Sequence, residues 1–280
     1  PLVRVRSALF GHYLVSMPFL NYGGPLGSDR AVQALAKAAT DRATADRAKL
    51  LELRCRTEAP LDLTRSTRKI TVVMELPATH AELMTRFPAK LRSQVRRPEK
   101  EGIVTRFGPD QVAPFYEVFR RHMHWLGTPA MPRRFFEALP AAFGEDVWFG
   151  CSYLGDRPIA CGAGFRWGDE FEITWASALV EFNKVAANMG LYWAFMKRAI
   201  DEGLRVFNFG RCSPDSGTHR FKRQWGSTDE ALSWYQHSAN GAASTPSPSS
   251  GPYSFGPKVW TRLPAALVDF AGPRLARLIP

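Results

Sequence analysis

Residues 147–209 decide the fold, and they read VWFGCSYLGDRPIACGAGFRWGDEFEITWASALVEFNKVAANMGLYWAFMKRAIDEGLRVFNF. Alternation of apolar and polar residues between Gly-containing turns predicts three consecutive strands, over 147–154, 159–167 and 170–176. A loop then leads to a helix over 188–202, in which Leu191, Phe195 and Ala199 fall at helical spacing. A buried strand follows over 204–209. Three antiparallel strands followed by a loop, a helix and a strand predict an α/β fold with a mixed sheet.

The composition is that of a globular protein with an excess of basic over acidic residues. The chain has 280 residues, of which 45% are hydrophobic and 12% aromatic, and this excludes a disordered chain. No apolar run approaches the ~18 residues of a membrane-spanning helix, and the length predicts about two domains. Lys and Arg exceed Asp and Glu by 37 to 26, a net charge of +11. This surplus favours polyanionic partners, and the alternative is a basic protein without one.

The four cysteines are Cys55, Cys151, Cys161 and Cys212, and they form no C-x-x-C pair. We therefore expect no zinc site, no other metal and no cofactor. A bridge between Cys151 and Cys161 across a hairpin is one reading. Burial as small apolar side chains in a reducing compartment is the other, and it indicates a cytoplasmic protein.

Residues 210–226 read GRCSPDSGTHRFKRQWG. This stretch resembles the pattern G-R-S-x-x-x-[ST]-G-x-x-x-F-K-x-x-W-G of FemAB-type proteins, and more narrowly of those associated with PEP-CTERM/exosortase systems. The resemblance covers nearly the whole chain. Supporting matches lie at residues 17–19, 21–24, 90–97, 126–129, 188–193 and 260–264.

The resemblance implies two tandem GNAT-like domains, each a mixed sheet flanked by helices. About 85 residues precede the second domain, fewer than a complete copy needs, so we expect the first copy to be truncated. The predicted division is a partial GNAT-like domain over 1–85, a GNAT-like transferase domain over 86–237, a Ser/Pro/Gly-rich flexible linker over 238–256 and a tail over 257–280. The tail is expected to pack on the first domain or to lie at the inner face of the membrane.

The same resemblance implies an enzyme, a transferase that moves an aminoacyl or acyl group onto an amine. Founding members of the family take amino acids from aminoacyl-tRNA and act in peptidoglycan synthesis. The implied acceptor is a phosphorylated or lipid-linked precursor of the cell envelope or of exopolysaccharide. An acyl-CoA-dependent N-acyltransferase of polysaccharide biosynthesis is an alternative. The loop over 177–190 argues against it, because it has a single late glycine and an acidic residue where a pyrophosphate would lie. A non-catalytic polyanion-binding protein is the second alternative, and no stable DNA binding is expected.

Candidate site residues come first from the 210–226 stretch. Lys222 matches the lysine of the family motif, which implies contact with an acceptor phosphate or help in the transfer step; the alternative is a solvated surface lysine. Arg211 follows a buried strand, where a guanidinium can bind phosphate or carboxylate, or form a structural ion pair. Thr218, His219 and Arg220 are predicted to line the same loop and bind substrate, and the near-neutral pKa of histidine also allows His219 a role as a base.

Further candidates lie outside that stretch. Glu172 shares a sheet face with Thr174 and is the carboxylate predicted to take the proton of the acceptor, unless it is merely exposed on its strand. Arg92 and Arg96, with Lys100, repeat every four residues and present cations on one helix face as a phosphate track, or as a solvated surface. Asn188 and Tyr192, from the matching stretch 188–193, are predicted to contact substrate.

Overall fold

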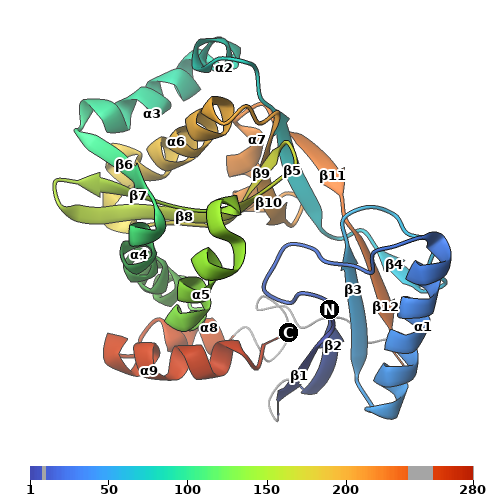
Figure 1. Ribbon diagram of the computed structural model, residues 1–280. Helices are drawn as coiled ribbons and strands as arrows, with labels where there is room; N and C mark the ends of the chain where they lie inside the picture. The colour runs from blue at the N-terminus through green and yellow to red at the C-terminus, as the bar shows by residue number, and fades with distance from the viewer. Residues whose placement is uncertain (8–10, 239–254, 280) are drawn as a thin grey trace.

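The computed structural model describes residues 1–7, 11–238 and 255–279, and it contains two mixed β-sheets with helices against their faces (Figure 1). The predicted mixed α/β fold is therefore confirmed. Most of the predicted linker, residues 239–254, lies outside the described part of the chain.

The larger sheet has the strand order β11-β5-β10-β9-β8-β7-β6. Its strands are β5 (Ile70–Glu75), β6 (Ile103–Phe107), β7 (Val147–Leu154), β8 (Arg157–Trp167), β9 (Glu170–Ala178), β10 (Val206–Cys212) and β11 (Thr228–Ala231). All neighbouring pairs are antiparallel except β9 and β10, which are parallel and joined through α6 (Ala187–Asp201). The predicted meander, helix and strand are thus present, because each was specified by local alternation and turn residues.

Helices cover both faces of this sheet. On one face, α6 packs against the sheet, and α3 (Ala89–Lys100) packs on α6. On the other face lie α4 (Val112–Trp125) and α5 (Arg133–Phe143), whose Phe115, Phe119 and Phe136 form a second apolar core with Phe149. Shorter helical segments are α2 (His80–Arg86), α7 (Gly217–Arg223), and the 3-10 turns at Pro109–Gln111, Gly144–Asp146 and Val180–Val185.

The smaller sheet has the order β1-β2-β3-β12-β4. Its strands are β1 (Val3–Ser7), β2 (Gly11–Val15), β3 (Leu50–Cys55), β4 (Thr64–Ser66) and β12 (Ser233–His237). Helix α1 (Asp29–Ala45) joins the parallel strands β2 and β3 and begins at Ser28, whose side chain caps the amide of Ala31. The order strand, strand, helix, parallel strand therefore occurs twice, as β1-β2-α1-β3 and as β8-β9-α6-β10.

One antiparallel ribbon joins the two sheets. Residues 64–75 run beside residues 228–237: β4 pairs with β12 in the smaller sheet, and β5 pairs with β11 in the larger one. Consequently β5, which precedes residue 86, lies in the larger sheet, and β12, from the other end of the chain, lies beside β3. The sheets cross the predicted domain boundaries, and the division into domains stays a prediction.

The C-terminal helices α8 (Phe255–Trp260) and α9 (Ala265–Ala276) lie beside α4 and the segment after it (Figure 1). Asp269 forms a 2.7 Å ion pair with Arg120 of α4, and Gly272 approaches the backbone of Ala130. These described contacts are with elements of the predicted second domain, and the expected position of the tail, on the first domain or at the membrane surface, stays a prediction. The contacts form because Val268, Gly272 and Ala276 present a narrow apolar stripe that fits against the 127–131 segment.

Candidate active site at the end of the parallel strand pair

The site begins where the two parallel strands separate. Hydrogen-bonded pairing of β9 with β10 runs from Glu170 opposite Val206 to Glu172 opposite Asn208, and ends there. Immediately after Asn208, β10 has a bulge in which Gly210 takes a positive φ of 73°. Such bulges redirect a strand, and the carboxyl ends of parallel strands are where α/β sheets bind ligands.

Glu172 is held at this point by neutral groups. The Asn21 Nδ2 atom donates a 2.7 Å hydrogen bond to Glu172 Oε1, and the Thr174 hydroxyl donates to the same oxygen at 3.0 Å. Among the described residues no Lys or Arg forms an ion pair with this carboxylate, although it is half-buried. A carboxylate without a bound cation is able to accept a proton or an ammonium group.

A buried asparagine beside Glu172 on the neighbouring strand binds a second carboxylate, Glu170. Asn208 is completely buried; its Nδ2 donates to the Tyr22 hydroxyl at 2.9 Å and to Glu170 Oε1 at 2.8 Å. Its Oδ1 accepts from the Thr71 hydroxyl and from the amide of Gly210. All its polar groups are thus satisfied, and the network fixes the bulge and the Tyr22 ring together.

Tyr22 and Arg56 complete this network from the N-terminal part of the chain. Arg56 Nη1 forms a 2.8 Å ion pair with Glu170 Oε2, and its guanidinium lies over the Tyr22 ring. Burial, and next the negative charge of Glu172, raise the pKa of Tyr22 far above its usual range. The hydroxyl therefore stays protonated and remains a hydrogen-bond donor at any working pH.

A cavity of about 660 Å³ opens beside these groups, between the 20–22 segment and the β8–β9 hairpin. Its lining includes Asp169, Glu170 and Glu172. Asp169 is bound to Arg205 and Glu170 to Arg56, so Glu172 is the carboxylate of this lining that has no cation bound in the described part of the chain. Phe165, Trp167 and Tyr22 form aromatic walls, and Trp167 is 87% exposed at the hairpin. Carboxylates and aromatic faces together are complementary to a cationic amine.

Arg211 lies on the other side of the bulge, against an aromatic ring. Its guanidinium sits 4.9 Å from the centre of the Trp234 ring, and that of Arg54 sits 4.7 Å from the same ring. Arg54 is paired with the buried Glu52 at 2.8 Å. Burial, and next the charge of Arg54, lower the pKa of Arg211 to about 10. Arg211 makes no hydrogen bond or ion pair to a carboxylate in the described part of the chain, so its N–H groups are available to an anion.

Lys222 is buried beneath the bulge rather than displayed on the surface. It is 3% exposed, and its Nζ atom donates to the carbonyls of Gly210 at 2.6 Å and Arg211 at 3.0 Å. Burial lowers its pKa to about 8, against the opposing effect of Cys212 and Glu172. Its contacts fix the backbone that carries Arg211, and its charge acts on Glu172.

The other three residues from the 210–226 stretch lie on α7. Thr218 and Arg220 are exposed, and Arg220 donates to the carbonyl of Asp215 at 2.7 Å. His219 Nδ1 accepts from the amide of Asp215 at 3.0 Å, while Nε2 lies 3.0 Å from Asp229. Both ring nitrogens of His219 are therefore occupied, and the ring ties the 213–216 turn to β11.

The remaining candidates lie farther from the bulge. Tyr192 is buried in the core, stacked on Phe209 at 5.7 Å, and Asn188 is half-buried in the first turn of α6. Arg92 donates to the carbonyl of Phe87, and Arg96 is exposed on the same helix, α3, which packs on α6. The structure thus brings Glu172, Arg211 and Lys222 around one bulge and leaves the α3 cations apart from them.

Sequence reasoning did not single out four of the residues in this network: Asn21, Tyr22, Glu170 and Asn208. The signal for two of them was in the matching stretch 21–24. Gly24 approaches Cys55 so closely that a Cβ there would lie 2.4 Å from the Cys55 sulfur, which packs this segment onto β3. Nothing in the local pattern of Glu170 or Asn208 distinguishes them from other strand residues.

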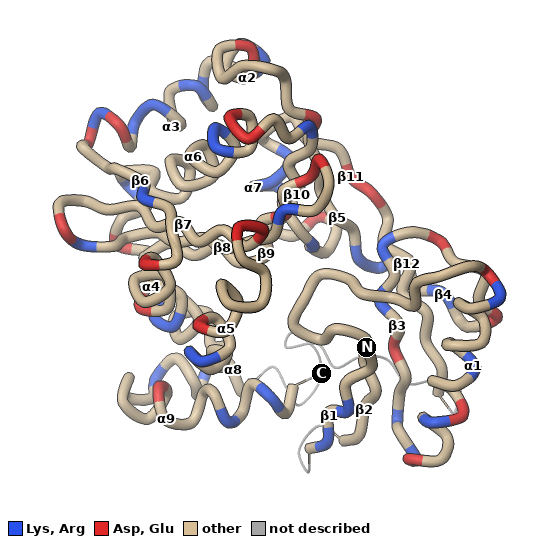
Figure 2. Tube along the Cα trace, in the orientation of Figure 1, with Lys and Arg blue, Asp and Glu red and all other residues tan. Residues whose placement is uncertain are grey.

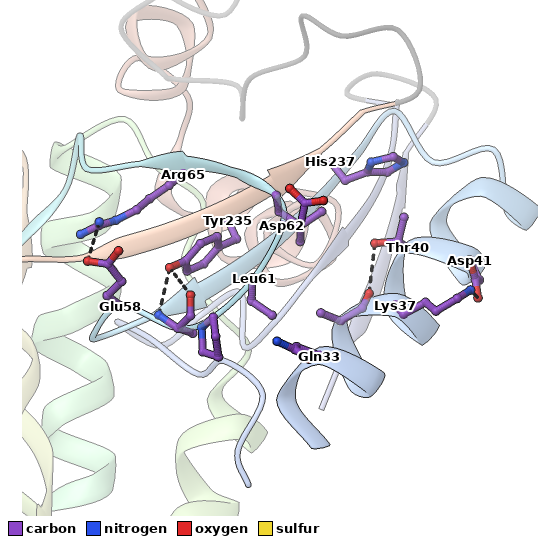
Figure 3. A pocket seen from close by; sticks show the side chains of 14 residues that line it. Gln33, Lys37, Thr40, Asp41, Glu58, Leu61, Asp62, Arg65, Tyr235 and His237 are labelled. Carbon is purple, nitrogen blue, oxygen red and sulfur yellow. Dashed lines mark hydrogen bonds and ion pairs between the residues drawn. The ribbon is translucent and has the colours of Figure 1, made fainter. Parts of the chain in front are cut away.

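A second cavity, of about 990 Å³, lies over the smaller sheet between α1 and the 58–63 segment (Figure 3). Four of its charged groups are paired, Lys37 with Asp41 and Arg65 with Glu58. The Tyr235 hydroxyl is bound to the backbone of Ala59. No three His, Cys, Asp or Glu side chains are grouped as metal ligands in residues 1–7, 11–238 and 255–279.

Comparisons with known proteins agree with the fold. Residues 85–223 match the model of the Acetyltransferase (GNAT) domain family. The crystal structure of FemX is similar with a TM-score of 0.61 at 14% identity, covering 86% of this chain and 88% of FemX.

Two other solved structures share the fold. L-PGS from Bacillus licheniformis has a TM-score of 0.58 at 12% identity, with 86% of this chain and 81% of that chain covered. The C-terminal domain of a putative lysylphosphatidylglycerol synthetase from Agrobacterium fabrum has a TM-score of 0.58 at 11% identity, with 85% and 81% covered. A search of curated proteins gave no match. Residues 85–223 therefore resemble a GNAT-type acetyltransferase domain, and the chain shares its fold with FemX and L-PGS.

Proposed function

We propose that this protein is a FemAB-like transferase that moves an aminoacyl or acyl group onto an amine of a cell-envelope or exopolysaccharide-related acceptor. The observation that carries the proposal is the position of Glu172. Its carboxylate lines an acidic cavity, is bonded by neutral donors, and stands where β9 and β10 separate in the GNAT-type domain. The narrower link to PEP-CTERM systems is supported by the sequence resemblance alone.

The groups around the cavity suit each step of such a transfer. The acceptor enters as an ammonium group attracted by the cavity carboxylates, and Glu172 takes its proton. The free amine then attacks the carbonyl carbon of the donor ester or thioester. A C–N bond forms, and the C–O or C–S bond breaks. The oxygen or sulfur leaves with the electron pair and takes the proton that the attacking nitrogen releases as the amide forms, giving a hydroxyl or thiol.

Two cations support the donor side of the reaction. Arg211 has free N–H groups for a phosphate or for the developing oxyanion, and Trp234 holds the guanidinium in place. Lys222 acts as a positioning residue, because its ammonium group is used by the carbonyls of Gly210 and Arg211. Tyr22, permanently protonated, donates toward the cavity carboxylates and keeps them oriented.

The donor we favour is aminoacyl-tRNA, and the reason lies at the start of α6. Gly190 is the one glycine of the 177–190 loop, and a Cβ there would lie 2.8 Å from Pro98. This glycine therefore serves the packing of α6 on α3, and not the approach of a pyrophosphate to the backbone. The exposed cations of α3, including Arg96, would then meet tRNA phosphates.

An acyl-CoA donor is the second candidate, favoured by the match of residues 85–223 to an acetyltransferase domain. In the third reading the chain binds polyanions without catalysis. The three readings differ in what must bind and in whether a product forms.

The test uses the full chain with two labelled donors, a pool of aminoacyl-tRNA and acetyl-CoA, and amine-bearing peptidoglycan and polysaccharide precursors as acceptors. Product is detected by mass spectrometry, and donor binding is titrated at 50 and 300 mM salt. We expect product that depends on tRNA. Glu172→Gln should abolish it. Glu137→Gln, which changes a residue of an exposed ion pair on α5, should leave it intact. Product from acetyl-CoA alone would move the protein to the N-acyltransferases. RNA binding that weakens steeply with salt, with no product from either donor, would overturn the assignment as an enzyme.

A further inference from the structure

Exposed apolar side chains are concentrated where α9 meets the end of α4. Of the large hydrophobic residues that are exposed in the described part of the chain, five lie here: Trp125, Leu126, Val259, Leu267 and Phe270. Phe270 is 64% exposed and Leu267 is 53% exposed, one turn apart on α9. Burial of Val268, Gly272 and Ala276 against the protein leaves Leu267 and Phe270 on the outer side of the helix.

A small pocket beside this apolar surface is lined by three arginines. It has a volume of about 320 Å³ and lies between α5 and α9, with Pro132 and Pro273 as its apolar walls. Arg134 comes from α5, and Arg274 and Arg277 come from α9. No carboxylate lines it, and none of the three arginines forms an ion pair among residues 1–7, 11–238 and 255–279.

The three arginines of this pocket differ from those at other contacts between elements. There Arg166 is paired with Asp146 and Glu202, and Arg120 with Asp269. Three arginines that line one small pocket bring positive charges together without an acid among them, and an anion would offset their repulsion. Figure 2 shows Lys and Arg positions along the C-terminal helices, where the single acidic residue, Asp269, is already bound to Arg120.

We propose that this surface docks on an anionic phospholipid bilayer, with the three-arginine pocket holding a lipid phosphate and Leu267 and Phe270 entering the interface. Arginines bind phosphate through paired N–H groups, and the apolar residues beside them lie at the depth of the acyl-chain boundary. Arg274 is already positioned for this, because its guanidinium lies 4.0 Å from the centre of the Phe270 ring and donates to the Phe270 carbonyl. No described helix is long and apolar enough to span a membrane.

Docking here is independent of the transfer chemistry, and its test is a binding measurement. The full chain is floated with vesicles of phosphatidylcholine alone or with 40 mol% (about two lipids in five) phosphatidylglycerol, at 50 and 500 mM salt. We expect binding only to the anionic vesicles, lost at high salt. The double variant Arg134→Gln/Arg277→Gln should lower the partition coefficient about 30-fold, the factor expected for two surface charges.

Matched variants separate this site from general charge. Lys90→Gln/Lys100→Gln removes two exposed cations from α3 and should leave vesicle binding within about twofold, because those charges lie away from the docking surface. Phe270→Ser tests the apolar part and should weaken binding at both salt concentrations. Equal losses in the two double variants would mean a diffuse electrostatic attraction and would overturn the site.

The source of the phosphate is distinguished in the same experiment. If the pocket takes free phosphate, 20 mM (roughly cellular-scale) inorganic phosphate at constant ionic strength should bind to wild type and shift its Tm, but not that of the double variant. In that case wild type should not float with the vesicles. That result would overturn the membrane assignment. Flotation that survives competition by inorganic phosphate would support it.

Discussion

Asn21 and Glu172 are 151 residues apart in the chain, yet the Asn21 side-chain amide donates a 2.7 Å hydrogen bond to the Glu172 carboxylate. The contact joins the segment after β2 to the strand that carries the candidate base. Asn21 also meets the β10 bulge, because a Cβ on Gly210 would lie 2.7 Å from its Nδ2 atom. The site is therefore built by both parts of the molecule.

Removing the Asn21 donor should affect the chemical step more than substrate binding. In Asn21→Leu the Glu172 Oε1 atom loses the hydrogen bond from Asn21 and keeps the one from the Thr174 hydroxyl, so the carboxylate is oriented less firmly. We expect kcat to fall about tenfold, the value of one hydrogen bond, with KM nearly unchanged. Thr174→Val removes the other donor, and the double variant should lose more than the product of the single losses. A rise in KM at constant kcat would show that Asn21 contacts substrate instead.

A side chain should destabilise the protein more at Gly210 than at Gly226, a glycine with a similar backbone conformation. Gly226 has a φ of 80° and no neighbouring atom near its Cβ position, so Gly226→Ala should cost only the backbone penalty of about 1 kcal/mol. Gly210→Ala carries that penalty and also meets Asn21 and the Ile173 carbonyl, and we expect about 2–4 kcal/mol. Urea unfolding of both variants measures the difference. Equal losses would mean that the Asn21 segment moves aside freely.

The buried ammonium group of Lys222 should make stability depend on pH in the alkaline range. Its pKa is about 8 in the folded protein and near 10.4 in an unfolded chain, so the unfolded state binds more protons between these values. The free energy of unfolding contributed by this group therefore rises with pH from about 8 to about 10.4, by about 3 kcal/mol.

Lys222→Met has no proton to lose, and comparison with it isolates the effect. The stability of wild type minus that of the variant should increase between pH 7 and pH 10, measured by urea unfolding. Lys184→Met, at an exposed position, should run parallel to wild type. Parallel curves for Lys222→Met as well would contradict a lowered pKa at this site.

The glycine of the α6 loop should behave as a packing residue. Gly190→Ala brings a Cβ to within 2.8 Å of Pro98, and we expect a loss of about 1–3 kcal/mol. Pro98→Gly removes both clashing atoms, Cβ and Cγ, so Gly190→Ala should cost much less in that background than in wild type. Gly217→Ala has no atom closer than 4.0 Å and should be close to neutral. Absence of relief would mean that the loop itself needs glycine, as a phosphate-binding loop does.

The meander and the helix after it could be predicted because their signals are local. Alternation within β7, β8 and β9, the turns at Gly155 and Gly168, and the apolar spacing in α6 need no distant partner. The matching stretch 210–226 likewise placed Arg211 and Lys222 near one another. The burial and the contacts of each side chain could not be predicted in the same way, since lysine is usually exposed and Lys222 is buried against two carbonyls.

The sequence by itself determined the strands and the helix of the second strand-strand-helix-strand unit and the residue types at its end. Tertiary structure alone decided that residues 64–75 and 228–237 form a shared ribbon between the sheets, and that Asn21 reaches Glu172. The alternation of apolar and polar residues along a strand indicates which face is buried, but not which other strand pairs with it. That choice depends on the burial of side chains from distant segments, and therefore it is made only when the whole chain packs.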